Sequence, residues 1–268
     1  MKYDLIIDSR PSEVVIALLR DGLLIELHKQ KHDNNFSVGD IYLGKVRKTV
    51  PGLNASFVNI GYEKDGFLHY LDLGPQFNSF KNFTRKAIDK KLNTASLKNF
   101  KKETNLEKDG KINDALKGGD LILTQISKEP ISSKGPRLTT EISLAGRYMV
   151  LMPFSDRVSI SQKIEDRAEK NRLKKLVQSI RPKGFGLIIR TVAEGQKVAS
   201  LDADIQQLLT RWKNLSAKLK QIDKYPAKVL SEINRSSSIL RDIFDDNFTG
   251  IHVDDAEMQV EIQDYIET

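Results

Sequence analysis

The sequence of 268 residues contains no cysteine. This absence excludes disulfide bonds, a thiol nucleophile and a cysteine-ligated zinc site within the chain. Histidine is also scarce, and the four residues are scattered at His28, His32, His69 and His252. A metal cage built from His and Cys is therefore excluded.

Long apolar runs are absent as well. No window approaches the roughly 20 residues of a transmembrane helix, and the first apolar run, MKYDLIID, carries charges and lacks a secretory core. We therefore expect a cytoplasmic protein without a membrane partner. Its 39% hydrophobic and 29% charged residues are ordinary for a globular protein of one large or two to three small domains.

Positive charge is in excess, with a net charge of +7 and a pI near 9.3, which favours polyanionic partners. The surplus is concentrated in residues 76–117, which hold eleven Lys and Arg against five Asp and Glu. Helical periodicity is weak there, so we predict a mobile loop with a fragment of helix. Two interpretations stay open: an electrostatic arm for RNA, or a solvated loop.

Residues 39–73 contain three strand-like runs, 41–50, 55–60 and 66–70, separated by Pro-Gly and Gly-rich turns. This spacing predicts consecutive antiparallel strands of a small barrel, with Gly44 at a bend or close approach. Phe57 and Phe67 fall on neighbouring strands among lysines and arginines, a combination suited to single-stranded nucleic acid. The alternative is that both rings are barrel core.

The flanking segments alternate between strand and helix patterns. The N-terminus predicts a strand at 3–8 and a hairpin, 14–19 and 23–28, around Asp21-Gly22. After the insert, the pattern predicts a strand from Leu121, a helix before Ile180, a strand at 187–192, and a helix over 201–222 with Trp212 in the core. Beyond Pro226 we expect a strand or short helix at 229–233, a helix at 239–244, a strand at 250–254 and a helix at 257–266.

Several motifs together resemble the ribonuclease E/G family. They are IYLGKV, SFVNIG and GFL in the first block, LTTEISLAGRYMVLMP after the insert, GLIIRTVAEG, and LRDIF followed by IHVD. The resemblance implies an α+β chain of several subdomains. It has a five-stranded OB-fold barrel of the S-one type inserted in a split RNase H-like subdomain, and a small α/β 5′-sensor subdomain. The implied boundaries are 1–37 and 216–268 for the RNase H-like parts, 38–140 for the barrel with its insert, and 141–215 for the sensor.

The resemblance also implies two sets of site residues. RNA would lie on Phe57, Phe67, Lys128 and Lys134. The 5′ phosphate of the RNA would bind at Arg190, Thr191, Gly146 and Val150. An arginine beside a hydroxyl suits a terminal phosphate, because the planar guanidinium forms paired, charge-assisted bonds. Taken without the resemblance, the ordinary interpretation of Arg190 is a surface charge at the end of a strand.

Carboxylates near the C-terminus do not predict a metal site. They are Asp242, Asp245, Asp246, Asp254 and Asp255, and nothing in the sequence shows them converging as a two-metal nuclease requires.

By the resemblance, the chain is the RNA-binding and 5′-monophosphate-sensing portion of a single-strand-specific endoribonuclease acting in RNA processing, including rRNA processing and mRNA decay. It covers the amino-terminal half of a family member, without the deoxyribonuclease-like subdomain whose aspartates hold Mg²⁺. We therefore expect no cofactor and no cleavage in this segment, and a homo-oligomer for the full-length protein. The alternative is a stand-alone, non-catalytic RNA-binding adaptor or regulator.

Overall fold

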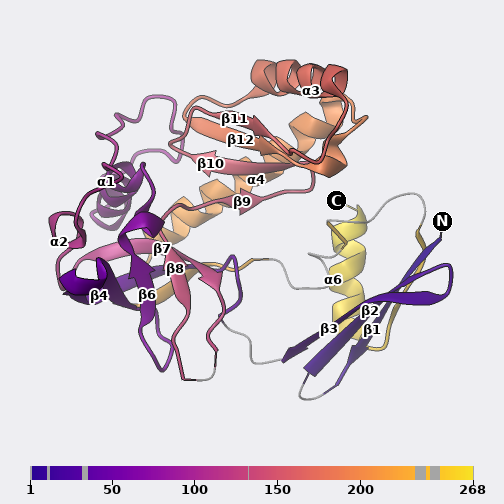
Figure 1. Cartoon of the computed structure of the whole chain (residues 1–268), viewed down its shortest axis with the longest axis horizontal. Coiled ribbons are helices and arrows are strands. Elements are labelled where there is room, and N and C mark those ends of the chain that lie inside the picture. The colour runs from indigo at the N-terminus through magenta and orange to yellow at the C-terminus, as the bar shows by residue number, and fades with distance from the viewer. Residues whose placement is uncertain are drawn as a thin grey trace. The chain divides into compact units, whose positions relative to one another are not determined.

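The computed structural model describes residues 2–10, 13–31, 36–131, 133–232, 240–241 and 248–267. The chain forms two compact units (Figure 1). One combines Met1–Asn35 with Ile233–Thr268, and the other is the continuous segment Phe36–Glu232. Each unit is described by itself below.

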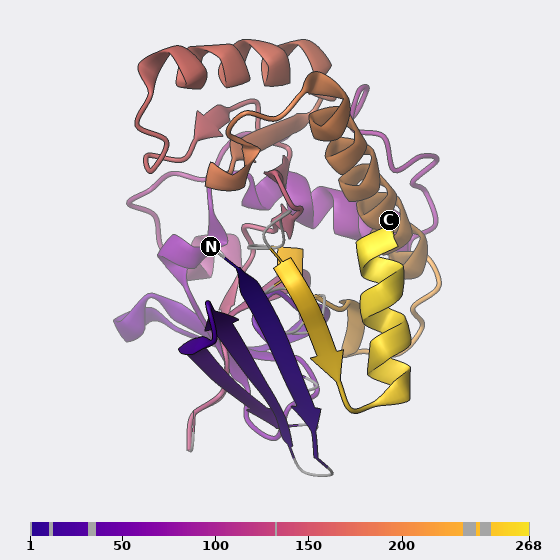
Figure 2. The ribbon, with the colours of Figure 1, turned by 90° about the vertical axis from the view of Figure 1, so that its right-hand side faces the viewer.

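The smaller unit is a four-stranded sheet in the order β14-β1-β2-β3, accompanied by helix α6. Its elements are β1 (Tyr3–Ser9), β2 (Glu13–Arg20), β3 (Leu23–Lys31), β14 (Phe248–Val253) and α6 (Ala256–Glu267). β14 runs parallel to β1, whereas β1, β2 and β3 are antiparallel to their neighbours. Figure 2 shows β14 (yellow) beside β1 (indigo), so both ends of the chain contribute to one sheet. The split α/β subdomain around an inserted barrel is thereby confirmed.

The predicted hairpin of this unit is also confirmed. Asp21 and Gly22 both have positive φ, 50° and 79°, as a two-residue type I′ turn requires. One face of the sheet packs into a small core formed by Leu5, Ile7, Ile16, Leu18, Leu240 and Ile262. The predicted helix at 239–244 lies mostly outside the described residues.

The larger unit begins with the barrel. Its strands are β4 (Ile41–Val50), β5 (Ala55–Asn59), β6 (Gly66–His69), β7 (Leu121–Lys128) and β8 (Arg137–Thr139), with 3-10 turns η1 (Pro51–Leu53) and η2 (Tyr70–Leu73). The strands pair in the order β4-β5-β6-β8-β7, and β7 pairs back with β4 to close the barrel. The predicted five-stranded OB fold is confirmed. A β-carbon on Gly44 would lie 2.7 Å from Val58 Cγ1, so the close approach expected at this glycine is present.

A further strand, β13 (Ala227–Leu230), pairs with the first half of β4. Sequence analysis placed residues 216–268 together, whereas residues 216–232 lie in the larger unit. The physical reason is the β4–β13 pairing, which no local pattern in the sequence indicates.

The fragment of helix predicted in the basic insert is present, and the loop expected around it is packed against the core. Residues Phe77–Ile88 form helix α1, and Ile112–Ala115 form the short helix α2. Apolar side chains along the insert are buried, namely Phe77, Phe80, Phe83, Ala87, Leu92, Leu97, Ile112 and Leu116. The insert therefore contributes to the core, because Phe77, Phe80, Phe83 and Ala87 share one face of α1 and the segment after α1 adds further buried side chains.

The last part of the larger unit is a sheet in the order β11-β12-β10-β9. Its elements are β9 (Leu144–Ala145), β10 (Met149–Pro153), β11 (Val158–Ile160), α3 (Arg167–Ile180), β12 (Phe185–Ile189), η3 (Thr191–Ala193) and α4 (Val198–Leu219). Trp212 of α4 is 1% exposed and lies in a core shared with Phe83 of the insert, as their ring centroids 5.0 Å apart show. The small α/β part of the predicted fold is confirmed.

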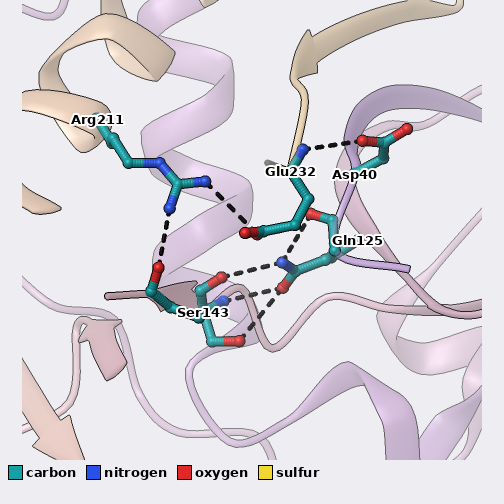
Figure 3. A network of polar contacts seen from close by, with 7 residues as sticks. Asp40, Gln125, Ser143, Arg211 and Glu232 are labelled. Carbon is teal, nitrogen blue, oxygen red and sulfur yellow. Dashed lines mark hydrogen bonds and ion pairs between the residues drawn. The ribbon is translucent and has the colours of Figure 1, made fainter. Parts of the chain in front are cut away.

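A network of polar contacts joins the barrel to this sheet within the larger unit (Figure 3). The Gln125 amide donates to the carbonyl of Ser143 and accepts from its N–H, at 2.9 and 3.0 Å. Arg211 of α4 donates to the carbonyl of Ala145 and pairs with Glu232, whose N–H donates to Asp40. These satisfied buried contacts fix the barrel against the sheet.

Candidate nucleic-acid interface

Phe57 and Phe67 form a pair on the outer face of the barrel. They are direct partners on β5 and β6, with ring centroids 5.9 Å apart in an edge-to-face arrangement. Their neighbours Val58 and Leu68 point into the barrel and are fully buried, because side chains alternate along a strand. Both phenylalanines are half-buried. The pairing leaves part of each ring accessible.

Cations flank this aromatic pair across the sheet. Lys48 of β4 is opposite Phe57, and its Nζ lies 5.4 Å from the ring centroid. Arg137 of β8 is opposite Phe67, and Lys128 of β7 is opposite Arg137. We call these five residues, Lys48, Phe57, Phe67, Arg137 and Lys128, the barrel row. Surfaces that bind single-stranded nucleic acid typically combine aromatic rings, which stack on bases, with cations, which contact phosphates.

The barrel row includes a residue that sequence analysis missed. The guanidinium of Arg137 donates two hydrogen bonds to the Asp72 carboxylate, at 3.1 and 3.2 Å, and is thereby held in place. Its only sequence signal is its position just after the Lys-Gly-Pro turn. The pairing depends on a register shift between Ile126 and Lys128, which the sequence does not show.

Lys134 lies outside the barrel row. It is exposed on the β7–β8 loop, where it forms an isolated β-bridge with Ile131. The same loop contacts the β5–β6 loop, because Lys64 Nζ donates to the carbonyl of Ser133 at 2.8 Å. Lys134 therefore adds positive charge at one end of β6 rather than beside the rings.

Arg190 directly follows β12, and both its backbone and its side chain bind the loop before β10. Its N–H donates to the carbonyl of Tyr148 at 2.8 Å. Its Nη1 donates to the carbonyls of Gly146 and Arg147, at 2.8 and 3.3 Å. The structure therefore brings together two of the predicted phosphate-site residues, Arg190 and Gly146.

The loop that holds Arg190 is itself held by Asp204 of α4. The Asp204 carboxylate accepts the backbone N–H groups of Arg147, Tyr148 and Met149 at 2.9, 3.0 and 2.9 Å. Burial raises the pKa of the Asp204 carboxyl, and the three N–H groups and the Arg190 charge oppose that shift. A β-carbon on Gly146 would lie 2.5 Å from Asp204 Oδ1, so glycine is required there.

Sequence analysis also missed Asp204, although a signal exists. Leu201, Asp204, Ile205 and Leu208 follow the spacing of one helix face, and all four are buried. A carboxylate at a core position of an amphipathic helix needs several hydrogen-bond partners, which the loop supplies.

The other two predicted phosphate-site residues lie near this loop. The Thr191 hydroxyl is 2.9 Å from the Ser161 hydroxyl, so it is tied to the end of β11. Val150 is half-buried on β10 opposite Ile188, which is 38% exposed. The predicted strand ends at Ile189, which places Arg190 and Thr191 at the start of η3.

An ion pair fixes the loop that follows Thr191. Glu169 accepts two bonds of 2.6 Å from Arg172 and one of 2.9 Å from the N–H of Gly195. Arg172 also donates to the carbonyl of Gln196. The Arg172 bonds lower the pKa of Glu169 to about 2, with help from the Gly195 N–H.

No group of three or more His, Cys, Asp and Glu side chains gathers to hold a metal ion anywhere in the described ranges. Asp254 accepts the N–H of Ser9 at 2.7 Å, and Asp255 accepts that of Met258 at the start of α6. Asp242, Asp245 and Asp246 lie outside the described residues. Each of the two described aspartates thus has a backbone N–H partner. None of the helices that the structure describes has the length and apolar content needed to span a bilayer.

Comparison with known proteins identifies the relatives of this chain. Residues 143–268 match the model of the Ribonuclease E/G family. The chain is 33% identical over 255 residues to Ribonuclease G of Escherichia coli K12, which covers 95% of this chain and 48% of the relative. It is 34% identical over 253 residues to Ribonuclease G of Haemophilus influenzae, with 94% and 47% covered. Ribonuclease E of Nostoc is 34% identical over 231 residues, with 86% and 30% covered. The chain spans about half the length of these ribonuclease G relatives, and it belongs to the ribonuclease E/G family.

Proposed function

We propose that this chain binds single-stranded RNA on the barrel row and binds the 5′ monophosphate of that RNA at Arg190. It would serve as the RNA-binding part of a ribonuclease G- or E-like endoribonuclease in RNA processing and decay. The observation that carries the proposal is the barrel row itself, in which two accessible rings lie between cations from three other strands.

The chemistry of the barrel row favours an unpaired strand. Bases can stack on Phe57 and Phe67 only when they are not paired, and the flanking cations contact phosphates whatever the sequence. Arg137 is held by Asp72, so its position is set before RNA arrives. A surface whose side chains are already fixed loses less conformational entropy when RNA binds, and this favours binding.

The first experiment measures the affinity of an unstructured RNA oligonucleotide by fluorescence anisotropy. Phe57→Ala and Phe67→Ala should each weaken binding by about 1–3 kcal/mol, roughly 5- to 150-fold, because each removes one base platform. Leu53→Ala is the matched control, since Leu53 is an exposed apolar residue at the barrel outside the row. Unchanged affinity of a folded double Phe variant would overturn the proposal.

The 5′ end of the RNA is proposed to bind at Arg190. Carbonyls of Gly146 and Arg147 orient its guanidinium, and the Asp204 clamp orients that loop in turn. A monophosphate offers doubly charged oxygens to such a group, whereas a 5′ hydroxyl offers none. Wild type should therefore prefer the 5′-monophosphate oligonucleotide by roughly tenfold or more, since charge-assisted bonds contribute about 1.5–3 kcal/mol each.

Arg190→Gln should remove this preference without changing the affinity for 5′-hydroxyl RNA. Thr191→Val should act in the same direction, because Thr191 and Ser161 border the same turn. Equal affinity of the wild-type chain for both oligonucleotides would overturn the 5′-end part of the proposal while leaving the barrel row in place.

We propose further that this chain binds RNA without cutting it. Hydrolysis of this kind needs carboxylates that converge on Mg²⁺, and no group of three or more potential metal ligands gathers in the described residues. A purified sample with Mg²⁺ should leave a labelled single-stranded RNA intact. Cleavage abolished by Asp254→Asn would contradict this expectation.

A stand-alone, non-catalytic RNA-binding adaptor or regulator is the second candidate. It predicts the same binding results. The two candidates differ in whether a catalytic segment attached to this chain hydrolyses the bound RNA, and a cleavage assay on the natural full-length protein decides between them.

A further inference from the structure

A pocket of about 520 Å³ shares no lining residue with the barrel row or with the loop around Arg190. It is lined by α4, by the turn between α3 and β12, and by residues 94–98 of the insert. Its volume is within the range of small-ligand sites, about 300–1,000 Å³. The insert thus forms one wall of a hollow that none of the predicted sites uses.

The floor of this pocket is apolar. It is made by Ala95, Pro182, Phe185, Leu209 and Trp212. The indole N–H of Trp212 donates to the carbonyl of Ala95 at 2.9 Å, so the polar edge of this ring is satisfied by the insert. Leu209 is half-buried, whereas Phe185 and Trp212, whose ring centroids lie 6.0 Å apart, are only 3% and 1% exposed. A ligand would therefore meet mainly carbon atoms.

Residues 94–98 of the insert pack closely against the turn between α3 and β12. Gly184 has φ of 88°, and a β-carbon there would lie 2.6 Å from Leu97 Cβ. Leu97 is buried in the main core. The insert is therefore packed against the turn, and the pocket is a fixed feature of the larger unit.

The charged residues around this pocket all have one sign. Lys98, Lys183 and Lys213 line it, each is exposed, and none of them pairs with a carboxylate in the described part of the chain. A second pocket, near Lys102, differs in this respect because Asp156 and Glu103 also line it. Three cations around an apolar hollow suit a ligand with a planar apolar body and negative charge beside it.

We propose that this hollow, which we call the lysine pocket, is a second RNA contact. One base of the strand lies against the half-buried Leu209 and Pro182, and the neighbouring phosphates lie at the three lysines. The proposal rests on the proposed function, because RNA supplies the bases and phosphates that the pocket would bind. It also gives the basic insert a role in RNA binding that depends on its folded wall rather than on a mobile arm.

The test compares salt dependence of RNA affinity in variants of the intact chain. Replacing Lys98, Lys183 and Lys213 with Gln should lower the slope of log affinity against log salt by about 2, since each phosphate contact on a single strand contributes about 0.7. Affinity at 100 mM salt should fall by about fivefold or more. These side chains are exposed, so the variant should fold.

The matched control replaces three exposed lysines that do not line the pocket, Lys174, Lys175 and Lys218, with Gln. Equal losses in the two triple variants would overturn the proposal, because the effect would then be one of total charge. Leu209→Gln is a second probe that leaves the charge unchanged, and it should weaken RNA binding at high salt as well as at low salt.

Competition identifies the ligand. The lysine-pocket variant should lose affinity for an oligonucleotide by a larger factor than for adenosine monophosphate, which carries one phosphate for the three lysines, and it should bind a polyglutamate peptide as wild type does. Preferential loss of the mononucleotide would assign the pocket to a free nucleotide, and preferential loss of the peptide to an acidic protein segment; either result would overturn the RNA assignment.

The two proposals fail separately. If the double Phe variant of the barrel row loses RNA binding and the lysine-pocket variant does not, the pocket assignment is wrong and the proposed function stands. If neither variant loses binding, the proposed function is wrong as well.

Discussion

Replacing Asp204 with asparagine tests how the structure holds Arg190. The carboxylate accepts three backbone N–H groups, one at Oδ1 and two at Oδ2. An asparagine can present its oxygen to the pair from Tyr148 and Met149, but its NH₂ then faces the N–H of Arg147. At least one bond is lost, and two donors face each other.

The magnitude follows from these contacts. A hydrogen bond to a charged group contributes about 1.5–3 kcal/mol, and a buried N–H without a partner costs about 1–3 kcal/mol. Burial raises the pKa of Asp204, so the neutral amide relieves part of the desolvation cost. We therefore expect Asp204→Asn to lower the free energy of unfolding of the larger unit by about 2–3 kcal/mol.

The assay is urea unfolding followed by the fluorescence of Trp212, the single tryptophan of the chain, which lies in the core of the larger unit. Asp202→Asn is the matched control, because Asp202 is on the same helix and, among the described residues, its carboxylate accepts a bond from Gln206 alone, at 3.4 Å. That variant should change stability by less than about 0.5 kcal/mol. Equal stability of the two variants would refute the role assigned to the Asp204 clamp.

Three further predictions concern the fold. Phe83→Ala should cost about 3–5 kcal/mol in urea unfolding, because the ring is fully buried; a loss near zero would restore the solvated-loop interpretation of the insert. Gly146→Ala should destabilise the chain and reduce the preference for 5′-monophosphate RNA, since its β-carbon would collide with Asp204; an unchanged preference by anisotropy would contradict this. The folded pKa of Glu169, about 2, is below its ordinary value of 4.5, so the stabilisation from its bonds is fully present above pH 4.5 and is lost as the pH falls towards 2. The stability difference between wild type and Glu169→Gln in urea should shrink over that range, and a constant difference would be inconsistent with the ion pair.

Much of the strand and helix pattern follows from the sequence, because each of these elements has a local cause. Strands β6 and β8 and the end of β5 alternate between buried and more exposed positions, and Asp21-Gly22 supplies the positive φ angles that a two-residue hairpin needs. The turn between the strand-like runs 55–60 and 66–70 also predicts that Phe57 and Phe67 lie on neighbouring strands, and in the structure they are direct partners.

The burial of the insert was not predicted, for a physical reason. Phe77, Phe80, Phe83 and Ala87 do follow one helix face, but Lys, Asn and Thr between them lower the average hydrophobicity of the segment. Burial depends on the face and not on the average. The wall of the lysine pocket could not be predicted either, because it joins residues 94–98 to Leu209 and Trp212, far apart in the sequence.

The composition of the barrel row depends on register. Lys48 is opposite Phe57 only because the register shifts between Val46 and Lys48, and a similar shift sets Lys128 beside Arg137. Shifts of this kind leave no periodic signal in the sequence. The Asp204 clamp was missed because its partners are backbone N–H groups, which any residue can supply.

Mapping of backbone amide signals by NMR tests the central claim most directly. The labelled chain is titrated with two RNA oligonucleotides that differ only in a 5′ monophosphate or a 5′ hydroxyl. Both should shift the amides of Phe57 and Phe67, and only the phosphorylated strand should also shift those of residues 146–149, Arg190 and Thr191. Shifts that avoid the barrel row with both strands, or the same shifts at Arg190 with both strands, would contradict the account.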